Sequence, residues 1–350
     1  MAGQDIVVVG ASAGGVEALM TLVSGLPRNL SAALFVALHL SSDGPSRLPE
    51  ILSRAGVLPA VHPADGEPIE YGKIYVAPPD YHLLLERGCV KLIRGPKENR
   101  NRPAIDPLFR SAAHAYGRRA AGVILTGGLD DGTSGLFTIK QKRGLAVVQD
   151  PQEALYSSMP RSALAHVDVD YVLPLHEIAP LLTRLANEHR DGEDLRATDP
   201  SQDECQAEDK VTNMENNDLQ REELKGDPSA FSCPECGGVL WEMKNGTLQR
   251  FRCRVGHAFS AESMLVEQSE ELDKALWMAL KTMEEKAELL QRMRDNAHQH
   301  SNSWLAQSLE TRFVEAQRHS QTLRQLLVEG GLKLSEPGFD QELQVPPSRE

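Results

Sequence analysis

The sequence predicts an α/β fold with a doubly wound, mostly parallel sheet, followed by a small cysteine-rich module and an α-helical hairpin. Three observations support this. Nearly continuous apolar runs alternate with helical patterns over residues 1–186, as in parallel sheets covered by helices on both faces. Cysteine and histidine residues then cluster between residues 231 and 260. Apolar residues recur at helical spacing over residues 261–330, which predicts amphipathic helices.

The apolar runs are short enough to be strands, and most are followed by a helical pattern. The predicted strands span residues 6–9, 33–38, 73–77, 82–86, 89–93, 122–126, 145–149 and 171–173. The predicted helices span residues 15–25, 46–55, 106–116, 134–143 and 175–188. The pair Arg87-Gly88 separates two of the strands by a tight turn, which predicts an antiparallel hairpin beside the parallel sheet.

The overall charge and hydropathy limit the class of protein. The net charge is −13, which disfavours nucleic acid or an anionic membrane as the main partner, because both require a basic surface. No apolar run approaches the roughly 20 residues of a membrane-spanning helix. The first residues also lack the basic segment of a signal peptide. We therefore expect a cytoplasmic protein with no nucleic-acid partner and no membrane insertion.

Residues 187–230 differ in composition from the segments on either side. They contain 14 Asp and Glu against 5 Lys and Arg, a net charge of −9, and no aromatic residue. Such a segment cannot bury a core and is predicted to be a disordered acidic linker. The predicted organisation is therefore an N-terminal domain (1–186), this linker, the cysteine-rich module (231–260), the helical hairpin (261–330) and a flexible tail (331–350).

The stretch IVVVGASAGG (6–15) ends the first predicted strand. A dinucleotide-binding turn would need a glycine where Ser12 stands, and a phosphate-binding loop would need a Gly-Lys-Ser/Thr sequence. The stretch instead contains G-x-S-x-G from Gly10 to Gly14, the pattern of a nucleophile elbow. Ser12 could equally be the N-cap of the next helix, and these five residues leave both interpretations open.

Two other predicted strands also end at residues that hydrolytic chemistry uses. His39 directly follows residues 33–38, and Asp130-Asp131 follow residues 122–126. Functional groups of an open parallel sheet gather at the carboxyl ends of its strands, and a serine nucleophile needs a base and a group that orients it. The order Ser, His, Asp differs from the Ser, Asp, His order of α/β-hydrolases.

Five blocks of the N-terminal domain occur in a characteristic order. They are IVVVGASAGG, His39, NRPAIDPLFRSAA (101–113), GVILTGGLDDGTSG (122–135) and QDPQEALYSSMPRSAL (149–164). Together they resemble the catalytic domain of the chemotaxis protein-glutamate methylesterases of the CheB type, over residues 4–186. The resemblance implies hydrolysis of glutamate methyl esters, and in many members deamidation of glutamines, on methyl-accepting chemoreceptors, which are therefore the expected partner.

The resemblance also implies roles for individual residues. By motif position Ser12 is the nucleophile, His39 the base and Asp131 the carboxylate that orients the base. The backbone amides of Ala13 and Gly128 correspond to the oxyanion hole. No cofactor is expected for catalysis.

Two departures from the family pattern stand out. The family's common Gly-Met-Gly-Asn before the catalytic aspartate is replaced by Gly127-Gly128-Leu129-Asp130, which alters the expected wall of the oxyanion hole. The chain also begins too close to the first strand for a phosphorylatable receiver domain. We therefore expect no phosphoryl gating within this chain, and its activity would be unregulated, controlled by its C-terminal half, or controlled by a separate protein.

The cysteine-rich module contains C-x2-C, sixteen residues and then C-x3-H. Cys233, Cys236, Cys253 and His257 form a Cys3His set that suits tetrahedral zinc. Four protein ligands leave no open position, so the predicted zinc is structural, in a zinc-ribbon-like module. Residues 239–253 are expected to form a hairpin with an Asn-Gly turn. The alternative is that these four residues lie unligated in a small core.

Two amphipathic stretches follow, separated by the polar residues 295–303. They predict two antiparallel helices. The hairpin either packs only on itself or provides a surface for oligomerisation or for docking a regulator.

Two other functions remain open from the sequence. The same triad could act on a different carboxyl ester or amide outside chemotaxis. The chain could instead be a non-catalytic sensory scaffold that binds modified partners, although a scaffold has no need of Ser12, His39 and Asp131 together.

Overall fold

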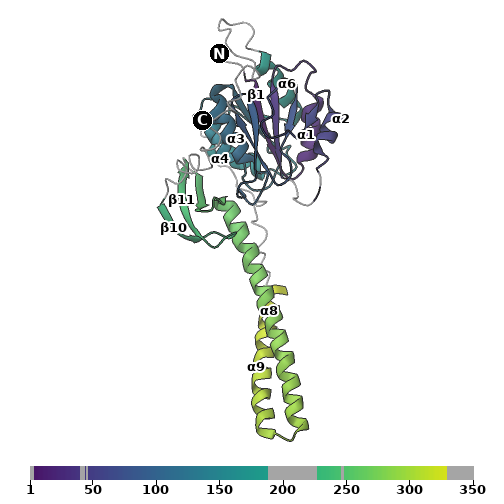
Figure 1. Ribbon diagram of the computed structural model, residues 1–350, viewed down its shortest axis with the longest axis vertical. Coiled ribbons are helices and arrows are strands. Elements are labelled where there is room, and N and C mark those ends of the chain that lie inside the picture. Colours follow the sequence, from purple (N-terminus) through teal and green to yellow (C-terminus); the bar gives the residue numbers. More distant parts are fainter. Residues whose placement is uncertain (1–3, 40–43, 45, 188–226, 246–247, 329–350) are drawn as a thin grey trace, which may run out of the picture. The chain divides into compact units, whose positions relative to one another are not determined.

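The computed structural model describes residues 4–39, 44, 46–187, 227–245 and 248–328 (Figure 1). The chain divides into two compact units, of which the first ends at Ser263 and the second begins at Met264. The first unit contains the α/β domain and the cysteine-rich module, and the second contains most of the helical hairpin. The predicted linker up to residue 226 and the predicted tail from residue 331 lie outside the described residues.

The α/β domain is built on a seven-stranded sheet in the order β3-β4-β2-β1-β7-β8-β9. All neighbouring strands are parallel, which confirms the predicted doubly wound sheet. The strands are β1 (Ile6–Ala11), β2 (Ala33–Leu38), β3 (Ala60–Val61), β4 (Ile74–Val76), β7 (Ala120–Ile124), β8 (Leu145–Gln149) and β9 (Tyr171–Leu173). As predicted, β5 (His82–Glu86) and β6 (Cys89–Ile93) form a separate antiparallel hairpin.

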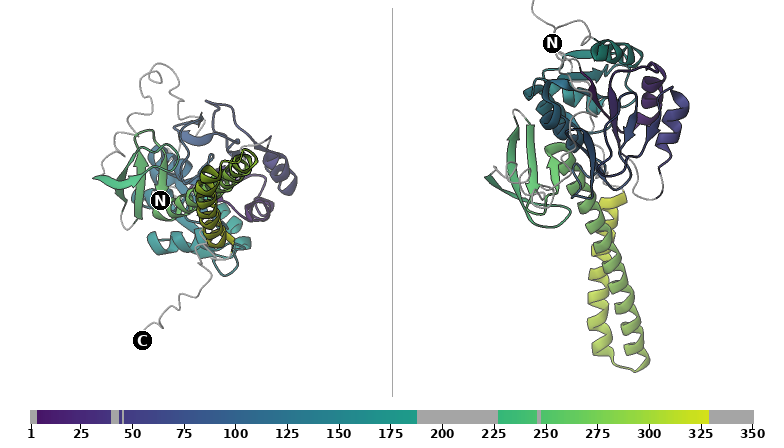
Figure 2. Two further views of the ribbon diagram at one scale, coloured as in Figure 1. Left: turned by 90° about the horizontal axis from the view of Figure 1, so that it is seen from below. Right: turned by 45° about the horizontal axis from the view of Figure 1, so that its top comes forward.

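Helices cover both faces of the sheet, as Figure 1 and the right view of Figure 2 show. One face carries α1 (Gly15–Ser24), α2 (Leu48–Ala55) and α6 (Leu175–Asn187). The other carries α3 (Ile105–Tyr116), α4 (Thr133–Gln141) and α5 (Ser158–His166), with a 3₁₀ turn at Gly117–Arg119 after α3.

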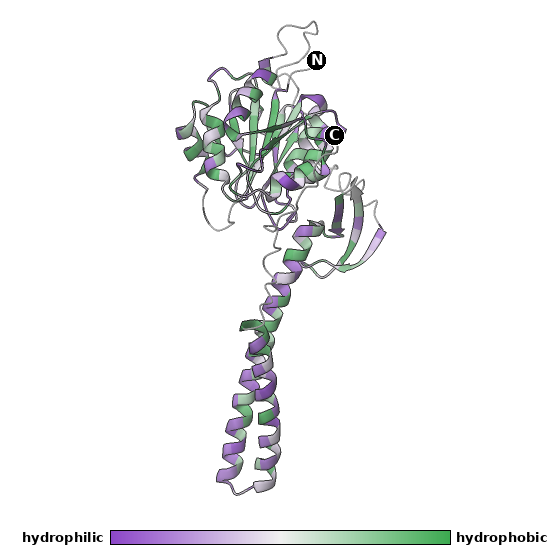
Figure 3. Cartoon of the chain, turned by 180° about the vertical axis from the view of Figure 1, so that it is seen from behind, coloured by the Kyte–Doolittle hydropathy of each residue, from purple (hydrophilic) through white to green (hydrophobic). Residues whose placement is uncertain are grey.

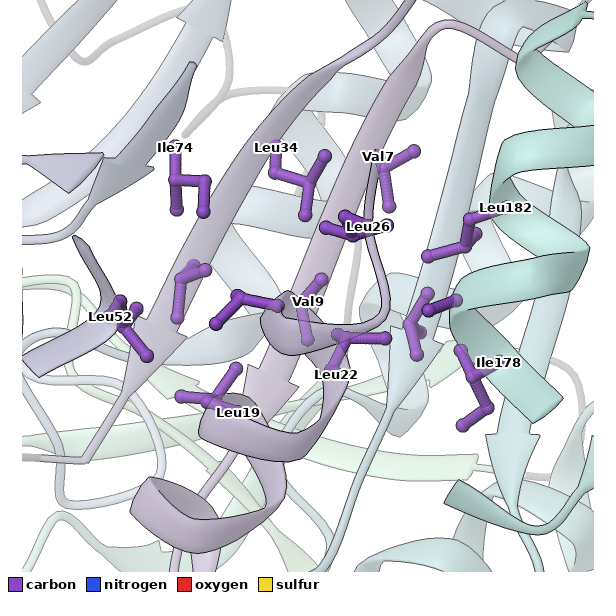
Figure 4. Close-up of a cluster of buried hydrophobic side chains, with 14 of the residues drawn as sticks. Val7, Val9, Leu19, Leu22, Leu26, Leu34, Leu52, Ile74, Ile178 and Leu182 are labelled. Atoms are coloured by element: carbon purple, nitrogen blue, oxygen red, sulfur yellow. The ribbon is translucent and has the colours of Figure 1, made fainter. Parts of the chain in front are cut away.

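The central strand β1 shows why the sheet needs both helical layers. Val7 and Val9 point into the core under α1, whereas Ile6 and Val8 point into the core on the other side, because successive strand residues face opposite ways. Figure 4 shows the first of these cores, where Val9 lies among residues of α1. In Figure 3 the apolar colour accordingly concentrates on the sheet.

Two elements of the α/β domain were not predicted. The strand β3 has only two residues, too few for a recognisable apolar run. The helix α5 begins with Ser158-Met159-Pro160, and serine and proline are typical of turns. Proline is tolerated there because the first turn of a helix has no intrahelical acceptor for its missing N–H.

The cysteine-rich module is a four-stranded antiparallel sheet, hereafter the ribbon (residues 227–260). Its strands are β10 (Asp227–Ser232), β11 (Val239–Asn245), β12 (Leu248–Cys253) and β13 (Ala258–Ser260), in this order. The predicted hairpin corresponds to β11 and β12, although residues 246–247 of its turn lie outside the described residues. The strand β10 begins inside the range assigned to the linker. It pairs through its backbone and leaves its side chains largely exposed, so the apolar pattern gives no sign of it.

The second unit consists of the rest of α8 (Ala261–Gln299) and α9 (Ser303–Val328). Arg294 pairs with Glu310 at 2.7 Å and Arg324 with Glu284, so the two helices are antiparallel as predicted. The turn is shorter than expected, since helix α8 continues to Gln299. Apolar and polar residues alternate along both helices (Figure 3). Among the described residues, every helix is too short or too polar to cross a bilayer.

Candidate active site

The G-x-S-x-G stretch forms a tight turn between β1 and α1. Gly14 has a left-handed φ of 71° and is the N-cap of α1, without a side-chain capping bond. Ser12 is therefore not the N-cap, which removes that interpretation. A Cβ on Gly10 would lie 2.4 Å from Ile105 Cγ2, so the helix α3 packs directly on this glycine. Ser12 donates its N–H to Thr126 O at 3.0 Å, which fixes the turn against the segment that follows β7.

Three adjacent parallel strands bring the predicted triad residues together. Ser12 follows β1, His39 follows β2 and Asp131 lies beyond β7. His39 Nδ1 is 2.9 Å from Ser12 Oγ, and His39 Nε2 is 2.7 Å from Asp131 Oδ2. The side chain of His39 is 13% exposed and that of Asp131 only 2%, so solvent reaches the base but hardly reaches the carboxylate.

The imidazole of His39 has one nitrogen available for each partner. The Asp131 carboxylate accepts the Nε2–H, which leaves the Nδ1 lone pair facing the hydroxyl of Ser12. In the serine proteases the two nitrogens have the opposite assignment. The chemistry is the same, because the hydrogen bond made by one nitrogen selects the tautomer that makes the other nitrogen a base.

The Asp131 carboxylate is held by donors on both of its oxygens. Oδ2 accepts the His39 bond and the Ile105 N–H at 2.7 Å. Oδ1 accepts from Asn99 Nδ2 at 2.8 Å and from the N–H groups of Gly132 at 2.9 Å and Asp106 at 3.2 Å. Two of these N–H groups belong to the first turn of α3, where the helix dipole favours negative charge.

This environment decides the charge of Asp131. Burial alone would raise its pKa, but the bonds from His39, Ile105 and Asn99 outweigh burial and hold the pKa below its ordinary value. The carboxylate therefore stays ionised and can stabilise a protonated His39.

Asp130 is placed differently from its neighbour. It is buried, and its Oδ1 accepts a hydrogen bond from Ser260 Oγ at 2.7 Å. Burial raises the pKa of Asp130 to about 7, against the opposing effect of the Ser260 bond. Of the pair Asp130-Asp131, the second residue is thus the one that contacts His39.

Asn99 is a site residue that the sequence reasoning missed. Its side-chain amide donates to Asp131 and also to Asp106 Oδ2 at 3.1 Å, and the residue has a left-handed φ of 47°. Asparagine tolerates this backbone conformation better than most residues. The signal was weak, because Asn99 stands just ahead of the 101–113 block in a polar stretch with no periodic pattern.

The two amide N–H groups assigned to the oxyanion hole, those of Ala13 and Gly128, are not used in hydrogen bonds within the described residues. No heavy atom lies within 4 Å of the place where a Gly128 Cβ would be, whereas a Cβ on Gly127 would lie 2.9 Å from Ser12 Cβ. The adjacent Leu129 has a left-handed φ of 59°.

A second site is formed by the Cys3His set in the ribbon. The ligand atoms of Cys233, Cys236, Cys253 and His257 all lie within 4.8 Å of one another. His257 Nδ1 is 3.7 Å from Cys233 Sγ and 3.6 Å from Cys253 Sγ, which is 3.6 Å from Cys236 Sγ. Zinc bonds of about 2.3 Å to sulfur and 2.0 Å to nitrogen give tetrahedral edges of about 3.5–3.8 Å. These four residues therefore fit a metal ion of that kind.

Comparison with known proteins points to one family. A family profile described as CheB methylesterase matches residues 7–182. A putative protein-glutamate methylesterase/protein-glutamine glutaminase from Leptospira interrogans is 40% identical over 182 residues, which cover 52% of this chain and 94% of the relative. Protein-glutamate methylesterase/protein-glutamine glutaminase 1 from Rhodospirillum rubrum is 38% identical over 189 residues, which are 52% of this chain and 49% of that protein.

A solved structure is similar over the same fraction of the chain. The crystal structure of the Thermotoga maritima CheB methylesterase catalytic domain superposes with a TM-score of 0.50 and 34% identity, covering 53% of this chain and all of that one. The ribbon and the helical hairpin lie outside the residues that the family profile matches.

Proposed function

This chain belongs to the CheB methylesterase family, and on that premise we propose that it hydrolyses glutamate methyl esters on chemoreceptor-type proteins through Ser12, His39 and Asp131. The observation that carries the proposal is the continuous hydrogen-bonded chain from Ser12 Oγ through His39 to the buried Asp131 carboxylate. A nucleophile, a base and an orienting carboxylate in this geometry support acyl transfer.

In the first step, His39 Nδ1 takes the proton of Ser12 as Oγ attacks the ester carbonyl. The carbonyl oxygen becomes an oxyanion, which the amides of Ala13 and Gly128 stabilise. A donor of this kind is worth about 3 kcal/mol in other hydrolases. The N-terminus of α1 also favours the developing negative charge.

In the second step, the tetrahedral intermediate breaks down. The protonated Nδ1 of His39 gives its proton to the leaving methoxide, and methanol departs, leaving a glutamyl ester on Ser12. Water then attacks this ester while His39 takes its proton. His39 returns that proton to Ser12 Oγ as the acyl bond breaks, and the receptor leaves with a glutamate side chain. Throughout, Asp131 stabilises the positive charge that His39 carries in each transition state.

The same steps apply to a glutamine side chain, from which ammonia would leave in place of methanol. The relatives carry both activities in their names. We include deamidation in the proposal as a second reaction of the same site, acting on the same class of receptor in the cytoplasm.

The ribbon is proposed to hold a structural zinc ion. Cys233, Cys236, Cys253 and His257 would supply all four ligands, so zinc would stabilise the fold of the ribbon and would take no part in bond cleavage. We propose that the chain consists of the catalytic domain, the acidic linker, the ribbon, which begins at Asp227, and the helical hairpin.

The test is methanol release from methylated receptor membranes. Ser12→Ala should lower the rate by at least about a thousand-fold. Ser24→Ala, an exposed serine at the end of α1, is the matched control and should keep the wild-type rate. A small activated ester is measured in parallel.

Each other outcome contradicts a part of the proposal. Hydrolysis of the small ester without methanol release would move the enzyme to another ester or amide substrate. No hydrolysis of either compound by folded wild-type protein would favour a non-catalytic scaffold. Equal rates for wild type and Ser12→Ala would remove Ser12 as the nucleophile.

A further inference from the structure

The ribbon contacts the loop that carries Asn99. Glu98 and Ala258 form a parallel bridge, and Asn99 donates its backbone N–H to Ala258 O at 2.8 Å. The side-chain oxygen of Asn99 accepts from Ser260 N at 3.0 Å and from Ser263 Oγ at 3.3 Å. Asn99 is therefore held through both its backbone and its side chain by the last ribbon strand and the residues that follow it.

These contacts determine where the other end of the Asn99 amide points. The amide group is planar, so bonds that fix Oδ1 also fix the direction of Nδ2. That nitrogen donates to Asp131 Oδ1 at 2.8 Å and to Asp106 Oδ2 at 3.1 Å. A single asparagine thus links strand β13 to the carboxylate that orients His39.

A second link runs through Arg250 of strand β12. Its side chain is 4% exposed, and its guanidinium lies 3.0 Å from Ser134 Oγ, 3.1 Å from Glu98 Oε2 and 3.5 Å from Asp106 Oδ2. Asp106 in turn donates its backbone N–H to Asp131.

Charge explains why this second link matters. Three buried carboxylates, those of Glu98, Asp106 and Asp131, lie in one cluster. Arg110 of the α/β domain pairs with Glu98 at 2.8 Å, and Arg250 adds a buried positive charge from the ribbon. Removing one partner of such a buried pair leaves a charge without compensation, so the neighbouring groups must rearrange or take up protons.

The Cys3His set lies between these two links. Strand β12 ends at Cys253 and strand β13 begins directly after His257, and Cys253 donates its N–H to His257 O at 3.0 Å. Two of the four candidate ligands therefore bound the turn that joins the two contacting strands. A metal ion bound there would fix both strands, since such sites couple ligand binding to folding.

We propose that the ribbon, together with the first turn of α8, is a positioning element of the active site. Arg250 and Ser260 of the ribbon and Ser263 of α8 hold Asn99 and Asp106 against Asp131, and metal at the Cys3His set maintains this contact. The proposal rests on the triad roles proposed above. These three residues do not touch the reacting atoms, so they are positioning residues, and metal occupancy becomes a way to control hydrolysis.

The main test uses Arg250→Met in the full-length, zinc-loaded protein. We expect kcat to fall by about 100-fold with KM within about two-fold of wild type, because displaced catalytic groups slow the chemical step more than they weaken binding. Arg250→Lys restores the positive charge but not the planar set of donors, so it should recover only part of kcat. Gln249→Ala, an exposed neighbour on the same strand, is the control and should match wild type.

A second readout does not depend on activity. The proton shared by His39 and Asp131 should give a low-field NMR resonance in the wild-type protein. In Arg250→Met, and after zinc is removed with a chelator, this resonance should broaden or shift while resonances of the sheet core stay in place. Adding zinc back should restore both the resonance and kcat.

Ser263→Ala guards against a misfolded Arg250 variant, since it leaves every buried charge in place and removes only the contacts of one hydroxyl group with Asn99 and Ser260. It should lower kcat several-fold and alter the same resonance. The proposal is overturned if Arg250→Met, Ser263→Ala and the zinc-free protein all keep kcat within about two-fold and leave the resonance unchanged. If wild-type protein hydrolyses no ester, the proposed function fails, and the resonance alone then decides whether the ribbon positions Asp131.

Discussion

The α/β domain and the ribbon hold their shapes in different ways, although both belong to the first compact unit. Every residue of β1 is buried, and apolar cores lie on both sides of it. In the ribbon, β10 is mostly exposed, and the buried residues include Arg250, Arg252 and two cysteines. A domain of the first kind has enough apolar area to fold by itself, whereas a module of about 30 residues needs a metal or a partner surface.

Because of this difference, the catalytic groups depend on different parts of the molecule. Ser12 and His39 follow adjacent strands of the sheet, so the apolar cores alone place them. Asp131 also depends on the loop of Asn99, which the ribbon contacts. Perturbing the ribbon should therefore affect Asp131 selectively, and perturbing the core should affect the whole α/β domain.

The largest expected effect is on the ribbon itself. Cys253→Ser removes one of the four candidate ligands, and structural zinc sites contribute on the order of 10 kcal/mol to folding. The variant should lose bound zinc, and hydrogen exchange over residues 227–260 should rise to the rate of an unfolded chain while the sheet stays protected.

Cys89→Ser is the matched control, because Cys89 is buried in the α/β domain outside the Cys3His set. It should keep one zinc ion per chain and a protected ribbon. Full protection of residues 227–260 in zinc-free Cys253→Ser would show that the ribbon folds without metal. It would then not differ from the α/β domain in this respect.

The next effect concerns Asp130, where ribbon and sheet meet through Ser260. Burial raises the pKa of Asp130 to about 7, so between about pH 4 and pH 7 the folded protein binds a proton that the unfolded chain releases. The contribution of this group to the free energy of unfolding is fully present at low pH and is lost as the pH rises through 7. The loss amounts to as much as about 4 kcal/mol. Asp130→Asn, which matches the family's common residue, should remove this loss.

The measurement is the free energy of unfolding of both proteins at several pH values. The two should be similar near pH 4, and Asp130→Asn should become progressively more stable up to pH 8. Ser157→Asn, at the N-cap of α5, serves as a control for a new amide, and its difference from wild type should not change over this range. A constant difference between Asp130→Asn and wild type would mean that Asp130 titrates normally.

The sequence predicted the parts of this site that depend on local patterns. Continuous apolar runs located the strands, and the parallel arrangement then placed Ser12 and His39 at one edge of the sheet. The residues alone left Asp130 and Asp131 as alternatives, and only the resemblance selected Asp131. Asn99 and the ribbon contacts were not predicted, because Asn99 and Ser260 are separated by 161 residues and no periodicity relates them.

The third effect concerns the apolar core between the sheet and helix α1. Leu19 on α1 is fully buried in the core shown in Figure 4, and Leu19→Ala should lower the free energy of unfolding by about 3 kcal/mol. Met20→Ala, the exposed neighbour at 38% exposure, should change it by less than about 0.5 kcal/mol. Zinc content should be unchanged in both. A larger effect from Met20 than from Leu19 would contradict the assigned core.

The smallest effect concerns strain that the sheet tolerates beside the active site. Leu129 has a left-handed φ of 59°, at a position where the family pattern has glycine. A Cβ in this conformation costs about 1–2 kcal/mol, which glycine avoids and which exceeds the entropic cost of glycine. Comparing Leu129→Gly with Leu129→Ala isolates the backbone, because both variants remove the rest of the side chain. The glycine variant should be more stable than the alanine variant by about 1 kcal/mol in chemical unfolding.

The sign of this difference is informative, because glycine normally destabilises a folded protein relative to alanine through the greater entropy of its unfolded chain. A more stable glycine variant therefore requires strain at residue 129, maintained because the packed ends of β7 and α4 allow no other path. A more stable alanine variant would mean that the loop relaxes freely. The sheet would then not fix the positions of Asp130 and Asp131. The ribbon contacts would contribute more to the placement of these two residues.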